Sequence, residues 1–460
     1  MVDESKSFAG TAVPVRFFQR LDWAAFGLTW MLSLAVYLYT LIPANDLCFS
    51  GIYSTSAFYL GVSNPPAYPV WTLYSALFVR LIPFSNIAWR VAVATAVASA
   101  LTCSLIALMV SRVGYLAVEN AGGFKELTVK EQKSFRVVCG CVAGLGFGLD
   151  GCFWSRALIA DQWNFNVFLF ALAVCLLTRW FFAPQQKRYL CLAALMLGLV
   201  LGDSEALFPA AFALPFLLAL GDPKVGREIF LLIGAFFCAV LATNPYSHWL
   251  DPSTFPCEII ATVLVVLVWI ILLILTRGFF SEWKTTLPCV LLFFTGASDW
   301  FLLPLFSMAD PPINWGYPRT VEGFFHVITR GQYGSDHFVE TFHGLLMQWA
   351  IYIKIAIEQF GLFYLAAAAI PVFLLHKIPS PVRRWIIGLL AVWLFLTLIM
   401  LVALNISLDK STYESNQLFF SPTHLLLAVL AGCGMMFIGA FCARPASRPV
   451  QKRAVPDVGG

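Results

Sequence analysis

Residues 421–442 read SPTHLLLAVLAGCGMMFIGAFC, a run without a single Asp, Glu, Lys or Arg. A helix of about 20 apolar residues spans the roughly 30 Å hydrocarbon core of a bilayer. Similar runs recur along the whole chain of 460 residues, which is 60% hydrophobic and 12% charged. Soluble domains are about 45–50% apolar and about 25% charged. The sequence therefore predicts an all-α integral membrane protein and excludes an ordinary soluble enzyme.

The same length requirement predicts twelve membrane-spanning helices in one polytopic domain over residues 1–442. They cover 22–43, 87–111, 136–153, 163–182, 188–203, 206–221, 228–244, 258–277, 285–305, 355–376, 383–405 and 421–442. No small-residue cleavage site follows the first span, so we expect an uncleaved signal-anchor. Residues 69–84 are apolar but shorter, and we expect them to form a helix along the membrane interface.

The distribution of charge predicts which loops face the cytoplasm. With a cytoplasmic N-terminus, 22 of the 29 lysines and arginines fall on the inner side, as the positive-inside rule requires. We therefore expect a multi-pass protein of the plasma (inner) membrane with both termini cytoplasmic. Residues 443–460 would be a basic cytoplasmic tail, and the long loops 44–86 and 306–354 would be extracytoplasmic. A net charge of +4 is too small for a nucleic-acid partner.

Polar and aromatic side chains gather in the outer connections. The first long loop contains the proline turn NPPAYP (64–69), and the third span opens into LDGCFWSRALIADQWNFN (149–166). The second long loop, MADPPINWGYPRTVEGFFHVITRGQYGSDHF (308–338), mixes aromatic rings with arginines. Arginine binds phosphate in a bidentate manner, and aromatic rings stack on the apolar faces of sugars. This mixture indicates a substrate that carries both a sugar and a phosphate.

Residues 60–93, LGVSNPPAYPVWTLYSALFVRLIPFSNIAWRVAV, resemble the N-terminal signature of a widespread bacterial family of multi-pass proteins. That family is related to a eukaryotic transmembrane protein O-mannosyltransferase of the GT-C glycosyltransferase superfamily. The segments WSRALIADQWNFN (154–166), PPINWGYPRTVEGFFHVITRGQYG (311–334) and FFSPTH (419–424) resemble it too. The resemblance implies a GT-C-like bundle of about 12 transmembrane helices, a polyprenyl-phosphate-linked sugar as donor, and an extracytoplasmic acceptor, possibly a protein.

The expected general base is Asp46 or Asp161. The family usually carries an Asp-Ser-Gly-Glu run in the first loop, where this chain has Phe49-Ser50-Gly51-Ile52. Asp46 would share a face with Phe49 if that segment were helical, and Asp161 matches a family glutamate. Such a base takes the proton of an acceptor hydroxyl while the anomeric carbon develops oxocarbenium character. Both aspartates suit helix N-caps equally well.

The other site residues fall into two groups. The donor phosphate is expected to be held by Arg319, Arg156, Arg330, His326 and His424. The residues expected to line the substrate are Asn64, Tyr68, Trp315, Tyr317 and Tyr333. The alternatives are an Arg319–Glu322 ion pair, structural histidines and an interfacial aromatic belt. No metal is expected, because Asp203 and Glu205 lack a third ligand in the sequence, and no cofactor is expected.

Three functions remain in order of preference. The first is a membrane glycosyltransferase that resembles the protein O-mannosyltransferases. The second is a catalytically degenerate relative that binds lipid or a partner without transfer, which the missing first-loop acids favour. The third is a transporter, but the sequence shows no internal repeats, and its acids gather at the outer ends of the spans rather than at mid-membrane.

Overall fold

The computed structural model describes residues 17–46, 49–119, 122–125, 127–247, 255–329, 339, 341–406 and 410–442. Within these ranges the regular structure is helical, and the one β pairing is an isolated parallel bridge between Val62 and Asn314. The predicted all-α class is therefore confirmed for the described part of the chain. The expected cytoplasmic tail, residues 443–460, lies outside the described residues.

A helix coincides with each of the twelve predicted spans. These helices are α1 (Arg20–Thr40), α4 (Ile87–Met109), α7 (Val129–Gly148), α9 (Trp163–Phe181), α10 (Lys187–Asp203), α11 (Pro209–Gly221), α12 (Pro223–Ser247), α13 (Phe255–Thr276), α14 (Trp283–Ala297), α17 (Phe342–Phe373), α18 (Ser380–Leu404) and α20 (Ser421–Cys442).

Shorter helices connect them. They are α2 (Ser50–Tyr59), α3 (Pro69–Leu81), the π-helix η2 (Val110–Gly114), α5 (Tyr115–Val118), α6 (Gly122–Lys125), α8 (Gly151–Ala157), η3 (Glu205–Leu207), η4 (Ser298–Phe301), α15 (Leu302–Met308), α16 (Val321–Ile328), η5 (Leu375–Lys377), α19 (Lys410–Asn416) and η6 (Gln417–Phe420). The helix expected over 69–84 is α3.

Seven helical segments in the described ranges are long and apolar enough to cross a bilayer, so the chain is a multi-pass membrane protein. The number becomes eight if α7 and α8, which meet at a bend of 76°, form one broken span. Two of the predicted spans are short, since α10 has 17 residues and α11 has 13. At 1.5 Å per residue these helices extend over about 26 Å and about 20 Å. The count of twelve crossings stays a prediction.

Close approach of helix backbones holds the bundle together. Helices α1, α4 and α7 pack against one another, α10 packs along α14, and α17 packs along α20. A Cβ atom on Gly144 of α7 would collide with the carbonyl oxygen of Cys103 in α4, and one on Gly434 of α20 with that of Ala367 in α17. Small residues allow this approach in membranes, where apolar side chains gain little by leaving lipid.

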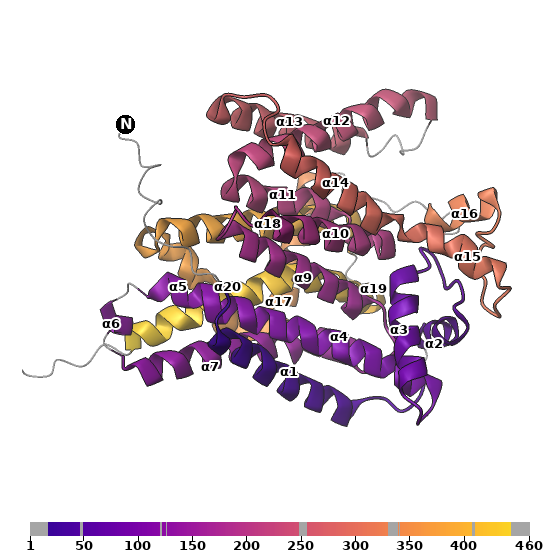
Figure 1. The fold of residues 1–460 in the computed structure, drawn as a ribbon, viewed down its shortest axis with the longest axis horizontal. Helices are drawn as coiled ribbons and strands as arrows, with labels where there is room; N and C mark the ends of the chain where they lie inside the picture. The colour runs from indigo at the N-terminus through magenta and orange to yellow at the C-terminus, as the bar shows by residue number, and fades with distance from the viewer. Residues whose placement is uncertain are drawn as a thin grey trace, which may run out of the picture.

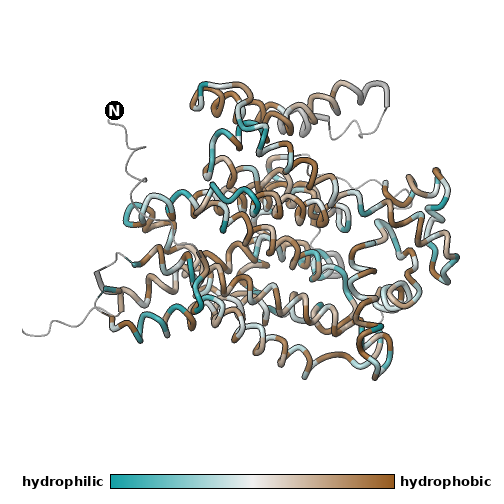
Figure 2. Tube along the Cα trace, viewed as in Figure 1, coloured by the Kyte–Doolittle hydropathy of each residue, from teal (hydrophilic) through white to brown (hydrophobic). Residues whose placement is uncertain are grey.

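The connections gather at two ends of the bundle (Figure 1). One end carries α2, α3, α15, α16 and α19, and the other carries α5, α6 and the start of α7. Hydrophobic residues run along most of the helices, whereas hydrophilic residues gather near helix ends and in the loops (Figure 2). Residues 49–86 and 306–329 of the predicted long loops lie at the first end, which we call the loop end, whereas residues 342–354 of the second predicted loop are part of helix α17.

Candidate active site

The two long loops are joined at the loop end through their backbones. The N–H of Val62 donates to the carbonyl of Ile313 at 2.9 Å, and the N–H of Trp315 donates to the carbonyl of Val62 at 3.0 Å. A Cβ atom on Gly61 would lie 2.6 Å from the Ile313 carbonyl oxygen, so the loops approach here because residue 61 is glycine. Segments from opposite halves of the chain therefore form one surface.

The proline turn positions Asn64 and Tyr68 beside this junction. The Pro65–Pro66 peptide is cis, and Tyr68 has a positive φ of 46°. The N–H of Ala67 donates to the Asn64 carbonyl at 2.9 Å, which closes the turn. Both predicted substrate-lining side chains are buried.

Asp203 anchors the helix that follows the turn. Pro69 at the start of α3 has no N–H, and the Tyr68 side chain does not cap the helix. Asp203 Oδ1 instead accepts the N–H groups of Val70 at 2.9 Å and Trp71 at 3.1 Å. A carboxylate is favourable at the positive end of a helix. Asp203 thus acts as a remote N-cap of α3. Among the described residues, no group of three His, Cys, Asp or Glu side chains could hold a metal ion.

Asp161 lies in the connection between α8 and α9 and is 7% exposed. Its Oδ2 accepts from Arg156 at 3.1 Å and its Oδ1 from the N–H of Trp163 at 2.7 Å. Its backbone N–H donates to the Thr95 hydroxyl of α4 at 3.2 Å. Burial raises the pKa of Asp161 above its ordinary value, and Arg156 opposes this rise. The predicted pair of site residues, Arg156 and Asp161, is therefore in direct contact.

Asp46 precedes helix α2. Residue 46 is not helical and α2 begins at Ser50, so the condition for a helix face shared by Asp46 and Phe49 is not met. The Asp46 carboxylate instead accepts from the Ser50 hydroxyl, and the same hydroxyl accepts the Asp46 N–H at 2.9 Å. The charge of Asp46 acts on Asp161 and adds to the rise of its pKa. The two candidate bases therefore belong to one cluster.

Tyr53 links this cluster to the proline turn. Its buried hydroxyl interacts with the side chains of Tyr68 and Asn64. Burial raises the Tyr53 pKa most, and Tyr68 and Asp161 raise it further. Its ring meets that of Tyr68 edge-on, with centroids 5.7 Å apart. Sequence reasoning missed Tyr53, although it follows the Phe49–Ile52 run that marks the first loop. We call Asp46, Asn64, Tyr68, Asp161 and Tyr53, together with Arg156, the carboxylate cluster.

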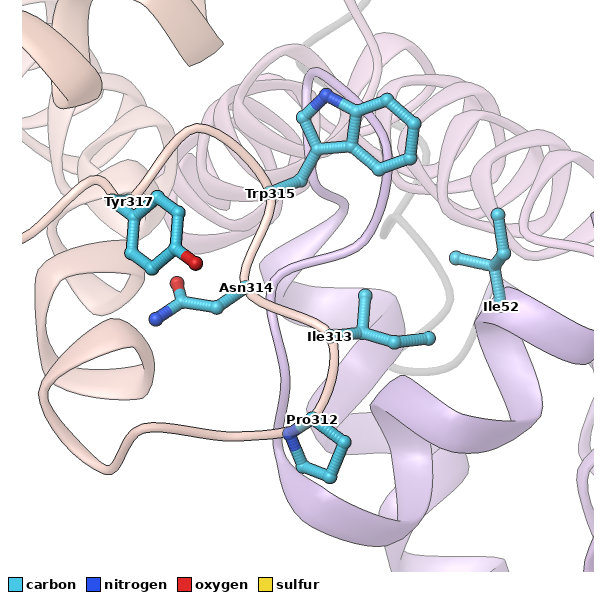
Figure 3. A pocket seen from close by; sticks show the side chains of 6 residues that line it. All are labelled: Ile52, Pro312, Ile313, Asn314, Trp315 and Tyr317. Atoms are coloured by element: carbon cyan, nitrogen blue, oxygen red, sulfur yellow. The ribbon is translucent and has the colours of Figure 1, made fainter.

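A cavity of about 420 Å³ lies between α2 and the second long loop (Figure 3). Its walls are Ile52, Pro312, Ile313, Asn314, Trp315 and Tyr317. Ile52 faces this cavity while the next residue, Tyr53, contacts the carboxylate cluster, because consecutive residues of a helix point about 100° apart. The predicted residues Trp315 and Tyr317 line the cavity, but Asp46, Asp161 and Arg319 are not among its walls.

Arg319 is exposed beside the cavity. Its Nη1 donates to Asp310 at 2.9 Å, and its guanidinium carbon lies 5.7 Å from the Tyr317 ring centroid. Asp310 and Tyr317 both have positive φ, 48° and 47°, which folds this segment back on itself. The partner of Arg319 is therefore Asp310, where sequence spacing suggested Glu322. An exposed pair of this kind is weak, so a phosphate can replace Asp310 at little cost.

The predicted histidines lie apart from one another. His326 is exposed on α16 next to the second loop. His424 is buried at the start of α20 among Tyr352, Phe360 and Phe420, and its Nε2 has no hydrogen-bond partner. It is not among the walls of the cavity. The remaining two candidates, Arg330 and Tyr333, lie outside the described residues.

The fold and the site together define a class of protein. The chain is a multi-pass helical membrane protein with a carboxylate cluster around the buried Asp161, and with a cavity lined in part by Trp315 and Tyr317, at one end of its bundle.

Comparison with known proteins gives the family relation. Residues 50–225 match the family model described as the protein O-mannosyl-transferase TMEM260 N-terminal domain. The chain is 24% identical over 412 residues to the protein O-mannosyl-transferase TMEM260 of Mus musculus, covering 87% of this chain and 48% of that protein. It is 22% identical over 426 residues to the Dictyostelium discoideum protein O-mannosyl-transferase tmem260, covering 89% and 44%. The chain is therefore related to protein O-mannosyl-transferases and spans about half the length of these relatives.

Proposed function

We propose that the chain is a membrane glycosyltransferase that moves a sugar, mannose in the first instance, from a polyprenyl-phosphate donor to a hydroxyl on an extracytoplasmic acceptor, possibly a protein. The observation that carries this proposal is the buried Asp161, paired with the partly exposed Arg156 and acted on by the charge of Asp46, at the end of the bundle where the two long loops meet. The relation to proteins named protein O-mannosyl-transferases supports it.

In this proposal Asp161 is the general base. A base works best when its pKa lies near the working pH, and burial raises the pKa of a carboxyl toward that range. Asp161 takes the proton of the acceptor hydroxyl, the new bond forms at the anomeric carbon, and the polyprenyl phosphate leaves. Asp46 shares the cluster and disfavours a second full negative charge there. Tyr53 and Asn64 orient the polar groups around it.

Arg319 and the cavity are proposed to receive the donor. Trp315 and Tyr317 offer aromatic faces for the sugar. Arg319 leaves its ion pair with Asp310 and binds the donor phosphate instead. Retention of lipid tests this part directly. The protein purified from membranes should carry a polyprenyl phosphate, or its glycosylated form, that mass spectrometry detects in the wild type and finds depleted in Arg319→Ala.

The transfer step is tested with proteoliposomes that contain radiolabelled polyprenyl-phosphate mannose and a Ser/Thr-rich peptide. A general base contributes about 10²–10⁴-fold to a rate, so Asp161→Asn should lower transfer by that factor, and Asp46→Asn should lower it less. Glu322→Gln is the matched control, because this exposed acid on α16 belongs to neither cluster nor cavity. Transfer that survives in Asp161→Asn would exclude Asp161 as the base.

A catalytically degenerate protein is the second candidate, and one observation favours it. Ile52 stands where the family usually has an acid, and it forms a wall of the cavity. Under this reading the wild type retains the donor lipid but transfers no sugar. Lipid retention without transfer, with Asp161→Asn indistinguishable from the wild type, would select it over the glycosyltransferase.

A further inference from the structure

Four arginines are buried among the described residues. Arg227 pairs with Glu228, and the other three lie at the end of the bundle opposite the candidate active site (Figure 1). Arg112 lies in the π-helix η2, Arg136 in the first half of α7 and Arg179 near the end of α9. Their exposed fractions are 5%, 6% and 5%. A buried guanidinium requires a counter-charge and hydrogen-bond partners, because leaving water is costly for an ion.

Arg136 has such partners. Its Nη2 donates to Asp22 at 2.7 Å, its Nη1 to the Gln19 side chain at 3.2 Å and its Nε to the Ser111 carbonyl at 3.3 Å. Both carboxylate oxygens of Asp22 already accept hydrogen bonds, because Asp22 also accepts from the Ser111 hydroxyl at 2.6 Å and from the Gln19 N–H at 2.8 Å. Asp22 therefore neutralises one of the three arginines.

Arg112 and Arg179 lack a carboxylate partner of this kind among the described residues. Both guanidinium carbons lie over the ring of Phe17, at 5.2 Å and 5.3 Å from its centroid. Neither forms an ion pair with any residue that the structure describes. Arg112 Nε and Arg179 Nη1 are buried N–H groups without a hydrogen-bond partner. Arg179 Nη2 donates to the side-chain oxygen of Gln186 at 2.7 Å, and this amide is neutral.

Within the described ranges, the acids nearby leave the charge of Arg112 and Arg179 uncompensated. Asp22 and the partly exposed Glu119 are the acids that act on Arg112, and Asp22 is already bound to Arg136. Both guanidiniums flank the same side chain, Phe17, and each has a buried N–H group without a partner. A guanidinium binds phosphate oxygens through N–H bonds of about 2.8 Å. Arg112 itself lies in the π-helix η2, and π-bulges are frequent at functional sites. The backbone at Arg112 therefore also indicates a binding site.

We propose that Arg112 and Arg179 form a binding site for a phosphate group at this end of the bundle, separate from the candidate active site. The ligand is a phosphate monoester or diester that supplies the missing negative charge and occupies the unpaired N–H groups. It comes either from the headgroup of an anionic lipid or from a free phosphate compound. The site holds whether or not the chain transfers a sugar.

The test uses the full-length protein purified in a neutral detergent. Thermal unfolding is measured with inorganic phosphate and with chloride at equal ionic strength, and lipid retention is measured by native mass spectrometry after mixing with phosphatidylglycerol or phosphatidylcholine. The variants are Arg112→Gln and Arg179→Gln. The control is Arg20→Gln, which removes an exposed arginine from the same end. Arg179→Lys keeps the positive charge but loses the planar guanidinium. This variant replaces Arg112→Gln in the comparison if Arg112→Gln does not fold.

A rise in Tm with phosphate that Arg112→Gln and Arg179→Gln lose, and Arg20→Gln keeps, identifies a free phosphate compound as ligand. Retention of phosphatidylglycerol but not phosphatidylcholine, weakened at least tenfold in the same variants, identifies a lipid headgroup. Arg179→Lys should bind with intermediate strength in either case. The proposal is overturned if neither ligand distinguishes the wild type from the variants, or if Arg20→Gln loses as much as they do.

Discussion

The contact between Arg156 and Asp161 makes a prediction about pH at the scale of single residues. Asp161 acts as a base only when it is deprotonated, so transfer should rise with pH through the raised pKa of its carboxyl group. Arg156 lowers that pKa, and its removal raises the pKa further. In Arg156→Gln the acid limb of the profile of kcat against pH should therefore move to higher pH, by about 1 unit or more.

The measurement is the rate of transfer at saturating donor between pH 5 and 9. Arg80→Gln is the control, because Arg80 lies on the neighbouring helix α3 and bonds only a backbone carbonyl of its own helix, that of Ala76. Its profile should match the wild type. A profile that keeps its midpoint in Arg156→Gln, or moves to lower pH, contradicts the assignment of Asp161 as base, even if the rate falls.

At the scale of helices, the bundle depends on backbones that touch. Gly144 of α7 faces the carbonyl oxygen of Cys103 in α4 and the Thr29 methyl of α1, so a single methyl group at residue 144 has no space. Gly144→Ala should separate three helices and cost about 1–3 kcal/mol, the usual range for overpacking. Thermal unfolding in detergent should show a Tm several degrees below that of the wild type.

Gly27→Ala is the matched control for this substitution. Gly27 lies in the same trio of helices, on α1, but no atom lies within 4 Å of a Cβ built on it. Alanine is the better helix former by about 0.5–1 kcal/mol, so Gly27→Ala should hold or raise the Tm. Equal losses in both variants would mean that glycine flexibility, rather than the close crossing, stabilises the bundle.

At the scale of the whole molecule, the sequence predicted what depends on local composition. The run over 421–442 is helix α20 with the same bounds. The sequence also placed Arg156 and Asp161 in one connection, and the structure adds that their side chains are in contact. Contacts set by tertiary structure were beyond such reasoning. Arg319 bonds Asp310 rather than Glu322 because residues with positive φ fold the second loop back. Tyr53 joins the carboxylate cluster only because α2 packs beside the proline turn.

The orientation of the molecule is the remaining prediction, and it decides from which side the candidate active site is reached. Glu322 lies on α16 at the loop end, and Lys133 lies near the start of α7 at the opposite end. Both are exposed. In right-side-out vesicles a membrane-impermeant maleimide should label Glu322→Cys and spare Lys133→Cys, and in inverted vesicles the pattern should reverse. Peptide mass spectrometry separates these sites from native cysteines such as Cys238 and Cys442.

The physical reason is the positive-inside rule, because 22 of 29 lysines and arginines fall on the predicted cytoplasmic side. Labelling of Lys133→Cys from the outside would reverse the orientation, and the cavity would then open to the cytoplasm. The donor and the acceptor would in that case have to be cytoplasmic, and the buried arginines Arg112 and Arg179 would meet phosphates of the outer leaflet. The predicted topology places an odd number of membrane crossings between Lys133 and Glu322. Labelling of both sites from the same side would contradict that number.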